Sequence, residues 1–247
     1  MVSSEKQQKR GIYLLPNLFT TAGLFAGFYA IVAAIRGDFE SAAIAVFVAM
    51  IMDGLDGRIA RMTNTQSAFG AEYDSLSDMV AFGLAPALVV FLWALLGLGK
   101  FGWMIAFIYA ACGALRLARF NTQIGTADKR YFQGLPSPAA AGTIAGWVWL
   151  GTSRGWDPAI LINIAVPLTF FCAILMVSSM RYYSFKDLDL KSRVPFVKML
   201  ALVLIFALIA NDPPLMLFLI FVTYAISGPV FTLFKLRQHR SERAHTK

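Results

Sequence analysis

Eight stretches of mostly apolar residues dominate this chain, each close to the ~20 residues that cross the hydrocarbon core of a bilayer as a helix. They run roughly over residues 13–35, 41–62, 76–98, 101–121, 135–153, 158–180, 195–211 and 213–236. Hydrophobic residues make up 58% of the 247 positions and charged residues 15%, whereas about 25% of an average soluble domain is charged. This composition excludes an ordinary soluble enzyme, a disordered chain and a disulfide scaffold. We therefore expect an all-α fold, a polytopic membrane helical bundle with about eight transmembrane helices, in a single domain over residues 1–247.

The basic residues predict which side of the membrane each connection faces. The chain has 22 Lys and Arg against 14 Asp and Glu, a net charge of +8. With both termini inside the cell, 19 of the 22 cations fall in inner segments, and only Arg36, Lys100 and Arg154 fall outside. The positive-inside rule therefore predicts an inner-membrane protein whose N-terminus (1–12) and basic tail (237–247) are cytoplasmic. The positive charge is then a topology signal with attraction to anionic lipid, and no nucleic-acid partner is expected.

The tryptophans give a second topology signal. All five map near the predicted outer ends of the apolar stretches, where an aromatic belt would lie in a bilayer. They are Trp93, Trp103, Trp147, Trp149 and Trp156.

Four aspartates are concentrated in one short segment, DGLDGRIARMTNTQSAFGAEYDSLSD, which covers residues 53–78. Asp53 and Asp56 are three residues apart, and Asp74 and Asp78 are four apart, so each pair shares one face of a helix. A polar turn between the pairs would bring the four carboxylates together at the inner membrane edge. Charges at membrane depth are costly, and their default interpretation is functional.

Four ionised carboxylates would repel one another strongly in a medium of low dielectric, and two divalent cations would balance them. Oxygen ligands favour Mg²⁺ or Mn²⁺ over zinc, and no His or Cys lies nearby in the sequence. Two such ions stabilise the attacking and leaving oxygens of an in-line displacement at phosphate. Gly57 and Gly70 would allow the backbone to approach a ligand, and Arg61 offers a fork for phosphate. The alternative is a set of structural ion pairs with Arg58 and Arg61, which the number and spacing of the acids disfavour.

The segment resembles the signature of the CDP-alcohol phosphatidyltransferase family, D-x-x-D-G-x-x-A-R followed by G-x-x-x-D-x-x-x-D. Every fixed position of that signature is present: Asp53, Asp56, Gly57, Ala60, Arg61, Gly70, Asp74 and Asp78. The resemblance implies that CDP-diacylglycerol binds through two metal ions and that an acceptor hydroxyl displaces CMP. It implies that Asp53, Asp56 and Asp74 are the main metal ligands, while Asp78 is the catalytic base and also touches a metal. It further implies a homodimer.

The same resemblance implies contacts to the cytidine diphosphate. Gly57, Arg61 and Ser67 match positions that contact the nucleotide in the family. The segment Pro16–Thr20 resembles the family's first-helix segment that faces the nucleotide, so Asn17 and Thr20 are candidate CDP-diacylglycerol ligands. Helix capping or packing is an equal alternative for these two residues.

A second polar cluster lies at the inner end of the fourth apolar stretch. Arg116 and Arg119 are three residues apart and could face the same cavity as the aspartates. The alternative is a solvated basic loop with snorkelling side chains. The segments RLARFN (116–121) and F-x-G-L-P-S-P-A-A (132–140) resemble the phosphatidylserine synthase branch of the family. That resemblance implies that L-serine is the acceptor, and we expect Arg116, Arg119 and Asn121 to hold its carboxylate and polar groups.

Two alternatives remain open from the sequence. The same chemistry could use glycerol 3-phosphate, inositol phosphate or choline as the acceptor alcohol. An ion-coupled transporter with an acidic ion site is a different class, which the position of the aspartates at the membrane edge and the lack of an inverted repeat disfavour.

Overall fold

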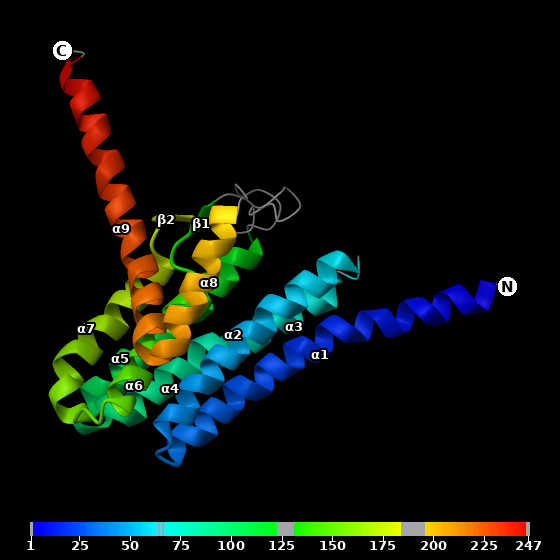
Figure 1. Cartoon of the computed structure of the whole chain (residues 1–247), viewed down its shortest axis with the longest axis horizontal. Helices are drawn as coiled ribbons and strands as arrows, with labels where there is room; N and C mark the ends of the chain where they lie inside the picture. The colour runs from blue at the N-terminus through cyan, green and yellow to red at the C-terminus, as the bar shows by residue number, and fades with distance from the viewer. Residues whose placement is uncertain (1, 64, 66, 123–130, 184–195, 246–247) are drawn as a thin grey trace.

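The structure, a computed structural model, describes residues 2–63, 65, 67–122, 131–183 and 196–245 (Figure 1). These residues are almost entirely helical, which confirms the predicted all-α class, with one small two-stranded sheet in addition. In chain order the elements are α1 (Val2–Ile35), α2 (Phe39–Met62), α3 (Ala68–Asp78), η1 (Met79–Leu84), α4 (Ala85–Val90), η2 (Phe91–Leu95), η3 (Leu96–Leu98), α5 (Lys100–Thr122), β1 (Tyr131–Gln133), α6 (Ser137–Ser153), α7 (Pro158–Val177), β2 (Arg181–Tyr183), α8 (Phe196–Asn211) and α9 (Pro213–His245).

Among the described residues, five helical stretches are long and apolar enough to cross a membrane, so the chain is a multi-pass membrane protein. They are Leu15–Ile35, Ala68–Leu98, Lys100–Thr122, Pro158–Val177 and Pro213–Phe234. The other three predicted stretches are also helical, but α6 and α8 have only 17 and 16 residues, and α2 carries aspartates and arginines near its end. The total of eight spans therefore stays a prediction.

Two helices continue well beyond the predicted spans. The backbone of α1 is already helical at Val2, and that of α9 remains helical to His245. Lys, Glu, Gln and Arg are good helix formers, so a helix need not end where its apolar stretch ends. In Figure 1 the start of α1 and the end of α9 project from the bundle as single rods. The predicted basic loops around residues 129–130 and 186–193 lie outside the described residues.

Helix α1 packs along α2 and also along α3, whereas the backbones of α2 and α3 hardly approach each other. The turn between α1 and α2 is closed by Asp38, whose carboxylate accepts a hydrogen bond from the Ser41 backbone N–H at 3.1 Å. Hydrogen bonds from the side chain and the backbone of Ser41 hold the pKa of Asp38 below its usual value. Figure 1 shows α1 and α2 running side by side from this turn, with α3 beside α1 at the far end of the pair.

The helix that carries the second aspartate pair changes its winding immediately after that pair. Residues Met79–Leu84 form a π-helical turn, a feature that often accompanies functional sites. Pro86 has no N–H to donate to the carbonyl of Phe82, four residues earlier. The buried hydroxyl of Tyr109 on α5 donates to that carbonyl at 3.2 Å, so α5 stabilises the altered turn.

The strands β1 and β2 pair antiparallel, with Tyr131 opposite Tyr183, and lead the chain into α6. Gly134 follows β1 at φ +79°, and a side chain there would lie 2.3 Å from the Met176 carbonyl, so only glycine fits between β1 and the end of α7. Tyr182 of β2 is buried and donates a hydrogen bond to the Ala225 carbonyl of α9 at 2.9 Å, and burial raises its pKa.

The predicted aromatic belt is only partly correct. Trp103 and Trp156 are exposed, as a belt requires, but Trp93 and Trp147 are each only 6% exposed and belong to the protein core. Trp147 packs against Trp156 and Phe218, with ring centroids 6.0 and 5.3 Å away. The proximity of a tryptophan to a helix end does not reveal whether it faces lipid or a neighbouring helix.

Candidate active site

The two aspartate pairs meet, as the spacing predicts. Asp53 and Asp56 lie near the end of α2, and Asp74 lies on α3 after the turn that separates the helices. One carboxylate oxygen from each of these three residues lies within 4.8 Å of those of the other two. Asp78, one turn beyond Asp74, lines the same small cavity, and its carboxyl group is within hydrogen-bonding distance of Asp53. The four carboxylates therefore form one cluster from two helices.

The donor set of this cluster fits a hard divalent cation. Oxygens bound to one Mg²⁺ are at most about 4.2 Å apart, because each lies about 2.1 Å from the ion. The 4.8 Å separation within the cluster is close to that limit, so small side-chain rotations would bring the three groups onto one ion. All of the candidate ligand atoms are carboxylate oxygens, which suit Mg²⁺ or Mn²⁺.

The first helix contributes Thr20 directly to this cluster. The Thr20 hydroxyl donates a hydrogen bond to Oδ2 of Asp56 at 2.8 Å, and both residues are 5% exposed. Thr20 also lines the cavity that the aspartates line. Asn17, one turn earlier, is half-buried, and its Oδ1 lies 3.6 Å from where a side chain at Gly70 would begin. The segment Pro16–Thr20 therefore lies beside both parts of the signature.

The candidate nucleotide residues gather around the turn between α2 and α3. Arg61 is exposed, and its guanidinium lies 3.8 Å from where a side chain at Gly57 would begin. Ser67 caps α3, since its hydroxyl accepts a hydrogen bond from the Gly70 N–H at 3.0 Å. A side chain at Gly70 would meet that hydroxyl at 3.1 Å. Glycine at both signature positions keeps the space beside Arg61 and Ser67 open.

Arg116 lies on the side of the cluster formed by α5. It is 8% exposed, and one of its terminal nitrogens donates to the Ser137 hydroxyl at 2.7 Å, at the start of α6. Its Nε is buried and has no hydrogen-bond partner. Arg116 interacts electrostatically with Asp78 and Asp53. A buried guanidinium with an unsatisfied donor next to the aspartates is well placed to bind an anionic group.

The other two candidate acceptor residues contact the protein itself. Arg119 donates to the backbone carbonyls of Val177 and Ser178, at 2.9 and 3.4 Å, and so caps the end of α7. Asn121 and Ser75 are joined by their side chains, with Asn121 Nδ2 donating to the Ser75 hydroxyl at 3.0 Å. Ser75 is the neighbour of Asp74 on α3. Among the three candidates, the structure brings Arg116 into the electrostatic surroundings of the aspartates.

Several residues of this site were not singled out from the sequence. Ser137 was part of the quoted motif, but nothing in the sequence indicated that it holds Arg116. Ser77 lines the aspartate cavity and donates to the Thr20 carbonyl at 3.1 Å. The spacing of Gly23 and Gly27, a small residue every four positions, is a signal for close helix packing that could have placed α1 beside the aspartates.

Comparisons with known proteins show which family the chain belongs to. The family profile described as CDP-alcohol phosphatidyltransferase matches residues 13–175. A CDP-diacylglycerol–serine O-phosphatidyltransferase of Helicobacter pylori is 37% identical over 224 residues, which cover 90% of this chain and 92% of that protein. A protein of the same name from Mycobacterium tuberculosis is 33% identical over 232 residues, 90% of this chain and 79% of that protein. An archaetidylserine synthase of Methanothermobacter thermautotrophicus is 34% identical over 170 residues, 68% of this chain and 69% of that protein.

Proposed function

This chain belongs to the CDP-alcohol phosphatidyltransferase family, and on that premise we propose that it transfers the phosphatidyl group of CDP-diacylglycerol to the hydroxyl of L-serine. The products are phosphatidylserine and CMP. The observation that carries the chemistry is the meeting of two aspartate pairs from different helices around one cavity. The choice of serine is supported by relatives named CDP-diacylglycerol–serine O-phosphatidyltransferase, whose matches cover 90% of the chain.

Asp53, Asp56 and Asp74 would hold the metal, and Asp78 would border it. Two Mg²⁺ or Mn²⁺ ions, when bound, would offset the charge of the diphosphate and stabilise CMP as the leaving group. With those ions bound, the aspartates would keep the diphosphate of the donor at the membrane edge, while its acyl chains stay in the bilayer. Arg61 at the end of α2 and Ser67 at the start of α3 would contact the cytidine diphosphate, with Gly57 leaving room for its phosphates. Asn17 and Thr20 would border the nucleotide from α1.

Asp78 would be the general base. Its carboxylate takes the proton of the serine hydroxyl as the hydroxyl oxygen attacks the phosphorus that carries diacylglycerol. The bond between that phosphorus and the CMP oxygen breaks, and CMP leaves. Of the four aspartates, Asp78 has the strongest electrostatic interaction with Arg116. This interaction supports a position of Asp78 between the donor and an acceptor held by the guanidinium.

Arg116 would bind the serine carboxylate. Its contact with Ser137 fixes one edge of the guanidinium, and its buried Nε remains available for a ligand. Arg119 and Asn121 would form the inner rim of the pocket for serine. Arg119 is hydrogen-bonded to the end of α7, and Asn121 is hydrogen-bonded to Ser75 of α3. A carboxylate bound by one buried arginine matches an amino acid acceptor, whereas choline would need an aromatic cage.

In the cell, the protein would lie in the inner membrane with both termini and the active site facing the cytoplasm, as the distribution of basic residues indicates. Serine and CMP would exchange with the cytoplasm, and both lipids with the bilayer. We also propose that it is a homodimer, as its family resemblance implies.

The decisive experiment is a panel of acceptors given to the full-length protein in detergent micelles with CDP-diacylglycerol and Mg²⁺ or Mn²⁺. We expect radiolabelled serine to appear in lipid together with stoichiometric CMP. Glycerol 3-phosphate, inositol phosphate and choline should give background release of CMP. Release of CMP with one of these alcohols but not with serine would reassign the acceptor, and no release with any of them would overturn the proposed reaction.

A further inference from the structure

Thr20 is hydrogen-bonded to both helices that carry the aspartate pairs. Its side-chain hydroxyl donates to Oδ2 of Asp56 on α2 at 2.8 Å. Its backbone carbonyl accepts from the hydroxyl of Ser77 on α3 at 3.1 Å, and Ser77 lies between Asp74 and Asp78 in the sequence. Thr20 and Ser77 are each 5% exposed, so water does not compete effectively for either bond.

These bonds matter because the backbones of α2 and α3 hardly approach each other, while α1 packs against both. Thr20, Gly23 and Gly27 recur at spacings of three and four and so share one face of α1. A side chain at Gly27 would lie 2.7 Å from Cα of Ala81, and one at Gly23 would lie 3.9 Å from the Ser77 hydroxyl. The glycines let this face of α1 fit between the two helices, and they place Thr20 at the level of the carboxylates.

The hydroxyl of Thr20 has two acceptors within reach and a single proton. The Pro16 carbonyl lies at 3.2 Å, and the Asp56 carboxylate at 2.8 Å. A hydrogen bond to an ionised carboxylate is shorter and stronger than one to a neutral carbonyl, so the proton is directed to Asp56. This bond restricts rotation of the Asp56 carboxylate, which also accepts a hydrogen bond from the Gly57 backbone, and other lone pairs of the carboxylate stay available for a cation.

We infer that Thr20 is a positioning residue that orients Asp56 and holds the two halves of the metal centre together. It acts through Asp56 and Ser77, and its hydroxyl is engaged by the protein itself. The inference rests on the proposed metal centre. Substitution of a group that hydrogen-bonds a metal ligand typically weakens metal binding about 10–100-fold, and we expect an effect of this size for Thr20.

The test is direct Mn²⁺ binding to the full-length protein in detergent, measured by the electron paramagnetic resonance signal of free Mn²⁺ without lipid substrate or serine. Thr20→Val removes the donor and keeps the shape of the side chain, and it should bind Mn²⁺ at least about 10-fold more weakly. Thr20→Ser keeps the donor and should restore affinity close to wild type. Thr21→Val is the matched control, because the Thr21 hydroxyl contacts the Asn17 carbonyl and the Tyr73 hydroxyl instead, and its Mn²⁺ affinity should not change.

Equal Mn²⁺ affinity in Thr20→Val and wild type would overturn the inference. A raised KM for CDP-diacylglycerol with unchanged Mn²⁺ affinity would also overturn it and assign Thr20 to the nucleotide. Wild-type protein that binds no Mn²⁺, or binding that Asp56→Asn does not weaken, would instead overturn the metal centre itself. Should Thr20→Val not fold, Ser77→Ala tests the second bond, since release of α3 from the Thr20 carbonyl should also weaken Mn²⁺ binding.

Discussion

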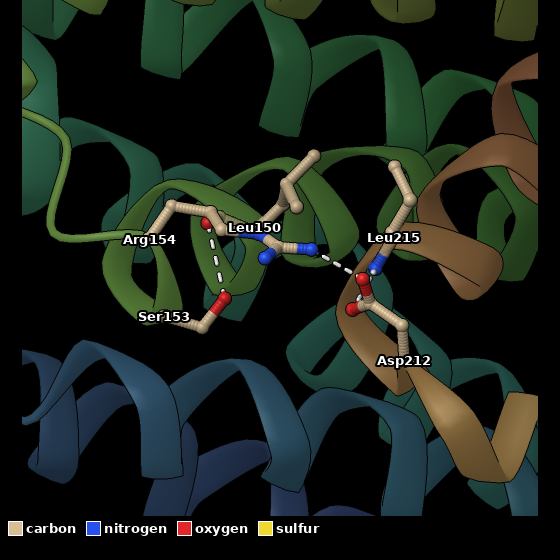
Figure 2. A network of polar contacts seen from close by, with 5 residues as sticks. All are labelled: Leu150, Ser153, Arg154, Asp212 and Leu215. Carbon is tan, nitrogen blue, oxygen red and sulfur yellow. Dashed lines mark hydrogen bonds and ion pairs between the residues drawn. The ribbon is translucent and has the colours of Figure 1, made fainter.

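Charged side chains join helices at both ends of this bundle, but carboxylates lie next to one another at one end and next to donors at the other. At the end where α2 turns into α3, four aspartates converge. At the opposite end, Arg154 after α6 pairs with Asp212 before α9 (Figure 2). The second carboxylate oxygen of Asp212 accepts from the Leu215 backbone N–H at 3.4 Å and caps α9. Glu40 likewise accepts a hydrogen bond from the indole N–H of Trp149.

The difference separates a structural use of charge from a chemical one. A carboxylate that faces a guanidinium and a helix N-terminus is stabilised within the protein itself. Carboxylates that face one another raise each other's energy, and a cation from solution lowers it. The aspartate cluster therefore depends on a ligand in a way that the Arg154–Asp212 pair does not. The same substitution made at both ends should have very different consequences.

The largest expected effect is on turnover. Asp78→Asn keeps the shape of the side chain and removes the base, so the rate of CMP release should fall by about 10²–10⁴-fold. Asp212→Asn makes the same chemical change at the other end and keeps a good helix cap, so its turnover should match that of wild type. Both rates are measured with saturating CDP-diacylglycerol and serine. Wild-type turnover in Asp78→Asn would remove Asp78 from the role of base.

The second effect is the response to divalent cations. A chelator should stop CMP release, and added Mg²⁺ or Mn²⁺ should restore it. Because the ion binds only the folded protein, Mn²⁺ at about 100 times its dissociation constant should stabilise the fold by about 2.7 kcal/mol, visible as a higher Tm. Asp53→Asn should reduce this increase in Tm, and Arg154→Ala should leave it intact. An increase of the same size in Asp53→Asn would show that the ion binds elsewhere.

The sequence predicted the aspartate cluster well because helical spacing and a short turn leave the four residues few other arrangements. Asp53 and Asp56 are three apart, and the turn before α3 is short, so local geometry limits how far apart the two pairs can lie. The resemblance to the family signature added roles that spacing could not supply.

The contacts between distant segments were not predictable in the same way. Arg119 and Arg116 looked equivalent in the sequence, yet Arg119 caps α7 and Arg116 approaches the aspartates. That distinction depends on the position of the end of α7, which lies nearly 60 residues further along the chain. The burial of Trp93 and Trp147 depends on helix packing in the same way.

The third effect is on the acceptor. Arg116→Ala should raise the apparent KM for serine by about 10-fold or more, because a hydrogen bond to a charged group contributes about 1.5–3 kcal/mol and each 1.4 kcal/mol is tenfold. The KM for CDP-diacylglycerol should change little. Arg119→Ala should raise the serine KM less and should lower Tm, since two carbonyls at the end of α7 lose their donor. Steady-state kinetics with serine as the varied substrate separate the two. An unchanged serine KM in Arg116→Ala would place the acceptor elsewhere.

The smallest expected effect is on the Arg154–Asp212 pair, and it tests directly whether that end of the bundle has only a structural role. Arg154 is 48% exposed and Asp212 is 23% exposed, so solvent screens their attraction. A double-mutant cycle with Arg154→Ala and Asp212→Asn should give a coupling free energy of about 0.2–1 kcal/mol, reduced further by added salt. Thermal unfolding in detergent measures the coupling, and turnover of all three variants should remain at the wild-type level. A large loss of turnover in Arg154→Ala would mean that the outer end positions the aspartates, because the pair connects α6 to α9 and α6 begins at Ser137, the residue that holds Arg116.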